Sequence, residues 1–197
     1  MRFFACLLAL IFALGAPSLG AQEAARPQEQ APAAQPRPPA ATLDSLFDRL
    51  SKAQSEREAE GISSLIERRF ARSGSDTADL LLSRAAEAFG KKDFPLAVEL
   101  IDRVLTLQPN WAEAWYKRAT VFYQLDDPVG AMADLHRALQ LEPRHFNAWT
   151  GLGHILMASD DKARALEAYR RVLKINPQSE VKTIVGHLGP EVDGQDL

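Results

Sequence analysis

The side chains of this sequence with the most chemical potential are its histidines. There are four of them, at His136, His145, His154 and His187. They are widely spaced, and none pairs at i, i+4 on one predicted helix with another histidine or an acid, the spacing that would place two metal ligands on one helix face. We therefore predict four solvated surface histidines and no metal site.

Two pairs of acids could serve acid–base catalysis. They are Asp126–Asp127 and Asp160–Asp161, which are 34 residues apart and fall between predicted helices. An aspartate just before a helix caps its free N–H groups, so capping explains both pairs better than catalysis does.

Other catalytic patterns are missing. The chain has no H-E-x-x-H, G-x-S-x-G, G-x-x-x-x-G-K-[ST] or C-x-x-C, and Gly151-Leu152-Gly153 lacks the third glycine of a dinucleotide fingerprint. The formal charge of −3 argues against phosphate-dominated nucleic-acid binding. We predict a protein that is not an enzyme, binds no nucleic acid and holds no cofactor.

The first 21 residues have the parts of a secretory signal peptide. Arg2 precedes a twelve-residue apolar run from Phe3 to Leu14, and small residues follow up to Ala21. Cleavage after Gly20 or Ala21 would also remove Cys6, the only cysteine. This predicts a periplasmic or secreted protein without membrane insertion after cleavage. An inner-membrane anchor formed by an uncleaved signal is the alternative.

Residues 22–41 change abruptly in composition to proline, alanine and glutamine. Such a segment cannot bury enough apolar surface to fold, so it predicts a disordered linker.

Beyond the linker, residue types recur every 34 positions. Prolines close three equivalent segments at Pro109, Pro143 and Pro177, and alanines recur at Ala97, Ala131 and Ala165. Arginine, leucine and aspartate follow the same period, and Trp115 and Trp149 share one register with Leu81. Agreement in these six registers indicates an internal repeat.

The repeated unit resembles the tetratricopeptide repeat (TPR) family, whose 34-residue unit is a helix–turn–helix. Residues 146–179 fill the family pattern almost completely, from Trp149, Gly153 and Ala165 to Tyr169 and Pro177. Residues 112–145 and 78–111 fit less fully, with Arg118 where an aliphatic side chain is usual. Leu43 to Leu50 ahead of such a stack also resembles small exported TPR proteins of proteobacteria.

Helix physics supports the same fold. Apolar side chains recur at helical spacing within each unit, an aspartate precedes each second helix, and a proline follows it. We predict an all-α stack of three repeats, 78–111, 112–145 and 146–179.

Both ends of such a stack need covering. Residues 42–77 predict a degenerate helix pair, Thr42–Gln54 and Glu56–Arg72, over the N-terminal edge. A capping helix is expected at 180–189, ended by Gly189 and Pro190, with a disordered tail at 190–197.

In the TPR family the first helix of each pair lines a concave face that binds peptides, and the resemblance carries that role onto twelve positions. They are Asp79, Leu82, Ala86, Phe89, Glu113, Tyr116, Thr120, Tyr123, Asn147, Thr150, His154 and Met157.

Chaperone-binding members of the family hold a peptide's terminal carboxylate with several Lys, Arg and Asn residues. The matching positions here are Leu82, Ala86, Lys117, Asn147 and Gly151, which supply one cation. The resemblance therefore does not extend to a carboxylate clamp.

Two hypotheses for the function remain. The first is an exported scaffold that binds a partner protein or peptide of unknown identity through its concave face. The alternative is a structural or accessory subunit of an envelope complex, which associates end to end, with copies of itself or with other subunits, or supports an enzyme without catalytic residues of its own.

Overall fold

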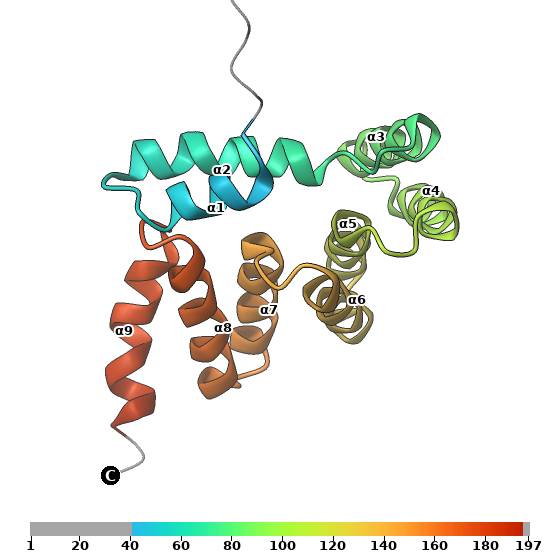
Figure 1. Ribbon diagram of the computed structural model, residues 1–197. Helices are drawn as coiled ribbons and strands as arrows, with labels where there is room; N and C mark the ends of the chain where they lie inside the picture. The colour runs from blue at the N-terminus through green and yellow to red at the C-terminus, as the bar shows by residue number, and fades with distance from the viewer. Residues whose placement is uncertain (1–40, 195–197) are drawn as a thin grey trace, which may run out of the picture. The chain divides into compact units, whose positions relative to one another are not determined.

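The computed structural model describes residues 41–194, which belong to one folded unit. The predicted signal peptide (1–21), the linker (22–41) except Ala41, and residues 195–197 of the predicted tail lie outside the described residues. The described residues form nine helices and no strand (Figure 1). The helices are α1 (Leu43–Leu50), α2 (Glu56–Phe70), α3 (Asp76–Gly90), α4 (Phe94–Leu107), α5 (Ala112–Gln124), α6 (Pro128–Leu141), α7 (Phe146–Ala158), α8 (Lys162–Ile175) and α9 (Val181–Asp193).

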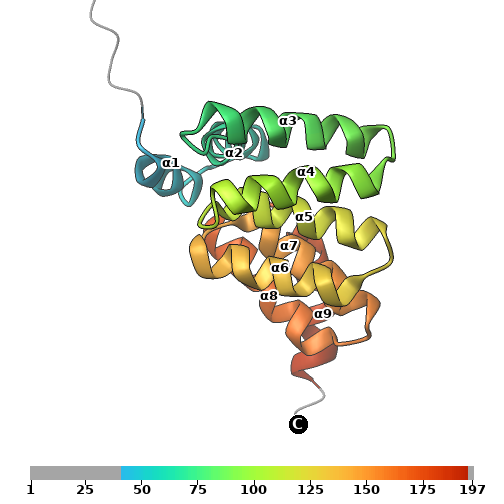
Figure 2. The ribbon, with the colours of Figure 1, turned by 90° about the vertical axis from the view of Figure 1, so that its right-hand side faces the viewer.

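Three helix–turn–helix pairs, α3–α4, α5–α6 and α7–α8, stack in chain order (Figure 2). Their second helices end at Leu107, Leu141 and Ile175, each two residues before a repeated proline. Ala97, Ala131 and Ala165 are fully buried where the two helices of a pair approach closely. The predicted all-α stack of helical pairs is confirmed.

In the turn inside each helix pair, one residue caps the second helix and the residue before it adopts a left-handed backbone conformation. Asp127 Oδ1 accepts a hydrogen bond from the Gly130 N–H at 2.8 Å and caps α6, whereas Asp126 adopts a left-handed backbone with φ of 59°. In the third pair Asp161 caps α8 and Asp160 has the left-handed conformation, and in the first pair Lys92 has that conformation. In all three turns the residue that follows donates its N–H back to the preceding helix, which satisfies a free carbonyl there. Both acid pairs therefore have structural roles.

The repeated tryptophans tie neighbouring pairs together. The indole N–H groups of Trp115 and Trp149 donate to the carbonyl oxygens of Pro109 and Pro143, each at 2.9 Å. A tryptophan in this register thus binds the turn that precedes its own helix. Gly153 is equally constrained, because a Cβ there would come within 2.5 Å of the Tyr169 ring.

The N-terminal helix pair does not lie over the N-terminal edge of the stack, contrary to the prediction. Helices α1 and α2 lie across the ends at which α5, α7 and α9 begin (Figure 1). The Trp111 indole donates to the Phe70 carbonyl at 2.7 Å, Arg144 pairs with Asp44 at 2.7 Å, and Gln178 donates to the Ala53 carbonyl at 3.2 Å.

The N-terminal edge of the stack is polar and exposed to solvent. Position 87 is an exposed glutamate, whereas the same register holds the buried Val121 and Ile155 in the later pairs. Arg84 is likewise exposed where the third pair buries Leu152. A terminal repeat with a polar outer face needs no cover, so the helix pair is free to pack elsewhere.

The predicted helix boundaries at both ends need correction. Helix α1 ends at Leu50 and α2 at Phe70, before the predicted Gln54 and Arg72. Helix α9 continues through Pro190 to Asp193. Ion pairs to α8 hold its last turns, from Glu191 to Lys162 at 2.6 Å and from Asp193 to Arg170. These contacts offset the backbone hydrogen bond that the proline removes.

Within residues 41–194 no helix combines the length and apolar character that crossing a membrane requires.

Candidate functional site

A run of hollows follows the inner helices of the stack. The first, about 190 Å³, is apolar and lies between Phe89 of α3 and Val121 of α5. The second, about 530 Å³, lies between α2 and the helices α3, α5 and α7, with Asp79, Glu113 and Asn147 in its wall. Leu82, Ala86 and Lys117 line both, so the two hollows are contiguous.

Two further hollows continue from Asn147. One of about 250 Å³ lies between α5 and α7 and is lined by Tyr116, Tyr123 and His154. The other, of about 490 Å³, lies between α2, α7 and the start of α9, with Glu60 and Gln178 in its wall. We call the four hollows together the inner groove.

The residues placed on the concave face by the family resemblance line this groove, with one exception. The exception is Met157, which packs against the hydrophobic core instead. The Tyr123 side chain is open to solvent, with 45% of its surface exposed. Leu82 is buried, so it shapes the wall more than it offers contact area.

The sequence did not predict that α2 would form a wall of the groove. Ser64, Glu67 and Arg68 face the hollow beside α3, and Glu56 and Glu60 face the one beside α9. Their amphipathic pattern indicates a helix but not the surface against which it packs, so nothing in the sequence could have assigned them to the groove.

His145 is completely buried, which contradicts the predicted surface position. It lies at the N-terminus of α7, where its Nδ1 accepts the Ala148 N–H at 3.2 Å and so caps the helix. Its ring stacks on Phe70 of α2 at 4.7 Å between centroids and tilts against Tyr116 at 4.9 Å. Because Nδ1 accepts, the ring proton is on Nε2 and is donated to Glu113 across 3.1 Å.

Glu113 is buried with its charge compensated. Burial alone would raise the pKa of its carboxyl group, but the hydrogen bond from His145 and the Lys117 ammonium, at 3.1 Å, outweigh it and lower that pKa. Burial and the charges of Glu113 and Glu67 raise the pKa of Tyr116 to about 12, so its hydroxyl stays neutral at physiological pH. The floor of the groove is therefore a fixed polar cluster.

We expect acid to destabilise the fold through Glu113. A carboxyl group whose pKa is lowered by folding contributes stability above its ordinary value of 4.5, and that contribution is lost as pH falls through the folded-state value. Denaturant unfolding at about pH 6 and about pH 3.5 should show a smaller loss of stability for Glu113→Gln than for the wild type. The control is Glu99→Gln on an exposed side chain. Equal losses in all three proteins would contradict this assignment.

The structure bears on the carboxylate clamp as well. The Nζ of Lys117, the one cation among the matching positions, is paired with Glu113, and Asn147 donates its side-chain amide to Glu67 at 2.9 Å. Neither group is left free to hold an anion.

Among the described residues, no cluster of three His, Cys, Asp or Glu side chains could hold a metal ion. The longer α9 does place His187 and Glu191 four residues apart on one helix, but Glu191 is paired with Lys162.

The fold and groove define a class of protein: stacked helical hairpins with a hollowed inner face. Two tetratricopeptide repeat family models match the chain, at residues 85–148 and 122–188, and together they span more than half of it. The chain belongs to the tetratricopeptide repeat family.

A curated relative has the same character. A TPR repeat-containing protein of Rhizobium etli is 32% identical over 97 residues, which are 49% of this chain and 48% of the relative. This chain therefore matches about half the length of that protein.

Solved structures agree on the fold. The first TPR of Spaghetti (RPAP3), bound to the HSP90 peptide SRMEEVD, is 18% identical with a TM-score of 0.56, and the match covers 60% of this chain and 95% of that one. The Sgt2 TPR domain from Aspergillus fumigatus is 22% identical with a TM-score of 0.56, covering 62% and 83%. The TPR2B domain of yeast Sti1, in complex with pHsp70, is 22% identical with a TM-score of 0.53, covering 61% and 99%.

Proposed function

We propose that this protein is an exported, non-catalytic interaction module that binds a segment of a partner protein in the inner groove. The observation that carries the proposal is the contiguous run of hollows along α3, α5 and α7, with Tyr123 open at its wall. Tyrosine supplies a large contact area at a low entropic cost, and it is enriched where proteins meet. The complexes of RPAP3 with an HSP90 peptide and of Sti1 with pHsp70 support the binding of a partner segment by this fold.

Export rests on the signal-peptide pattern of residues 1–21. It places the partner among envelope or secreted proteins. Mass spectrometry of the protein recovered from a periplasmic fraction tests this. A mass that corresponds to the loss of the first 20 or 21 residues would support export.

End-to-end association, the alternative function, has less support. The outer face of the first repeat carries Arg84 and Glu87 in registers that are buried apolar positions in the third. At the other end, α9 packs on α8.

Site-specific cross-linking tests the groove. We expect a photoreactive p-benzoylphenylalanine at position 123 to form a discrete cross-linked species in cells. The same group at position 129, where Val129 is 71% exposed at the start of α6, should not form it. A second experiment places the photoreactive group at position 116, beside the same hollow. Its cross-link should disappear in the variant Tyr123→Ala/His154→Ala, because Tyr123 and His154 both line that hollow. A species formed equally from positions 123 and 129 would count against the groove.

A further inference from the structure

The inner groove is much more acidic than the protein as a whole. Six carboxylates and two cations line it, an excess of four negative charges, whereas the entire chain has a net charge of −3. The acids are Glu56, Glu60, Glu67, Asp79, Glu113 and Glu180, and the cations are Arg68 and Lys117. The negative charge of the chain is thus concentrated in its candidate binding surface.

Of the two cations that line the groove, Arg68 lies at the hollow beside α3 and forms no ion pair within the described residues. The ammonium of Lys117 is already paired with Glu113 at 3.1 Å. By contrast, Glu56, Glu60 and Glu180 form no ion pair with any residue of the described chain, although all three line the hollow beside α9. In the hollow beside α9 an acidic ligand would therefore meet repulsion, and a cationic one would meet carboxylates without a competing partner.

A second observation points to a ligand at the same hollow. The Ser63 Oγ atom is buried in its wall and has no hydrogen-bond partner within the described part of the chain. Leaving a buried hydroxyl unsatisfied costs free energy, and a rotation of the Ser63 side chain toward the hollow would let a donor or acceptor of a ligand satisfy it. Side chains of Asn147, Thr150, Asn176 and Gln178 add further polar groups around it.

The other hollows require apolar side chains from the same ligand. Phe89, Leu82 and Ile101 surround the smallest hollow, and Tyr116 and Tyr123 border the one between α5 and α7. Because Asn147 lines three of the four hollows, one extended chain can reach both apolar and acidic regions.

We propose that the inner groove binds an extended basic segment of a partner protein, whose Lys or Arg side chains lie between α2 and the starts of α7 and α9 while apolar residues fill the hollows beside Phe89 and Tyr123. This rests on the proposed peptide-binding function and adds the chemistry of the partner. It is the opposite preference from that of RPAP3, whose bound peptide SRMEEVD carries three acids and one arginine.

A display selection from random linear peptides on the purified full chain tests the assignment. The selected peptides should be enriched in Lys and Arg over Asp and Glu relative to the starting library, and their affinity should fall as salt is raised, because salt screens charge pairs at an exposed surface. Glu60→Gln/Glu67→Gln should weaken a selected peptide roughly three- to tenfold. Glutamine preserves the oxygen that accepts from Asn147, and both positions are exposed, so the fold should be unaffected.

The matched control is Glu99→Gln/Glu167→Gln, which removes two exposed acids from α4 and α8 and should change affinity by less than about twofold. Selection of acidic or uncharged peptides that still compete with the cross-link at position 123 would overturn the basic preference and leave peptide binding intact. No enrichment at all would overturn both.

Two other occupants of the groove are tested with the same proteins. A synthetic peptide of residues 22–40 that binds more tightly than the selected basic peptides would assign the groove to the chain's own linker. A dimer in light scattering that Glu60→Gln/Glu67→Gln dissociates would assign it to a second copy. Either result would overturn the partner assignment.

Discussion

Arg118→Met is expected to lower the free energy of unfolding by about 3–5 kcal/mol. Arg118 joins three helices: its Nε and Nη2 donate to both oxygens of Asp134 at 2.7 and 2.8 Å, and its Nη1 donates to Asp102 at 2.6 Å. Its guanidinium also lies over the Trp115 ring at 4.8 Å. Asp134 is only 4% exposed, so removing the arginine leaves a buried carboxylate without a partner.

Urea unfolding of a small set of variants checks this. Arg118→Met/Asp134→Leu should recover much of the loss, because a buried ion pair replaced on both sides by apolar groups is often neutral. The control Arg103→Met removes an arginine that is 62% exposed and paired only with Glu99, and it should cost less than about 1 kcal/mol. A loss of that small size for Arg118→Met would show that the three-helix contact contributes little.

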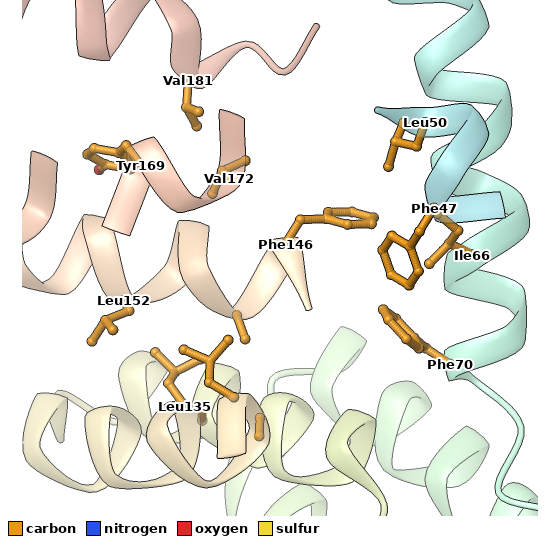
Figure 3. Close-up of a cluster of buried hydrophobic side chains, with 14 of the residues drawn as sticks. Phe47, Leu50, Ile66, Phe70, Leu135, Phe146, Leu152, Tyr169, Val172 and Val181 are labelled. Carbon is orange, nitrogen blue, oxygen red and sulfur yellow. The ribbon is translucent and has the colours of Figure 1, made fainter. Parts of the chain in front are cut away.

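Phe146→Ala is the second large effect, with an expected loss of about 3–5 kcal/mol. Phe146 is the first residue of α7 and points toward Phe47 and Ile66 of the N-terminal pair (Figure 3). It is 6% exposed, and truncation would leave a cavity where α1 and α2 meet the stack. The wall that α2 contributes to the groove should loosen along with the loss of stability.

Amide hydrogen exchange measured in α2 and in α5 distinguishes local loosening of α2 from a general loss of stability. In Phe146→Ala, the amides of α2 should lose protection more than those of α5. Val129→Ala, at a side chain that is 71% exposed, should change stability by less than about 0.5 kcal/mol. Uniform loss of protection across both helices would mean that α2 does not move separately from the repeats.

Eleven of the twelve positions assigned to the concave face line the inner groove, because the repeat period transfers position from one unit to the next, and their binding of a partner stays a prediction. A side chain one period after Glu113 must lie on the same face, which is why Asn147 lines the groove with it. Met157 shares the register of Phe89 and Tyr123, which line the groove, but its side chain packs against the hydrophobic core. The repeat period predicts the position of a side chain on its helix, but the local packing decides whether that side chain faces the groove or the core.

Arg118 shows the same limit from another side. This position of the repeat usually holds an aliphatic residue, and the sequence alone shows only that Arg118 departs from that pattern. Asp102 and Asp134 lie 16 residues before and after it, and only the fold brings both carboxylates to one guanidinium.

The amino-acid sequence by itself determined the number and order of the repeated hairpins, because helix caps, prolines and apolar spacing act over a few residues and recur every 34. It could not place α1 and α2, since an apolar helix face specifies that it must be buried but not against what. Tertiary structure made that choice, and with it Phe70 covers His145, Glu113 becomes a buried charge, and α2 becomes a wall of the groove. These contacts join residues 32 to 75 positions apart, so no local pattern encodes them.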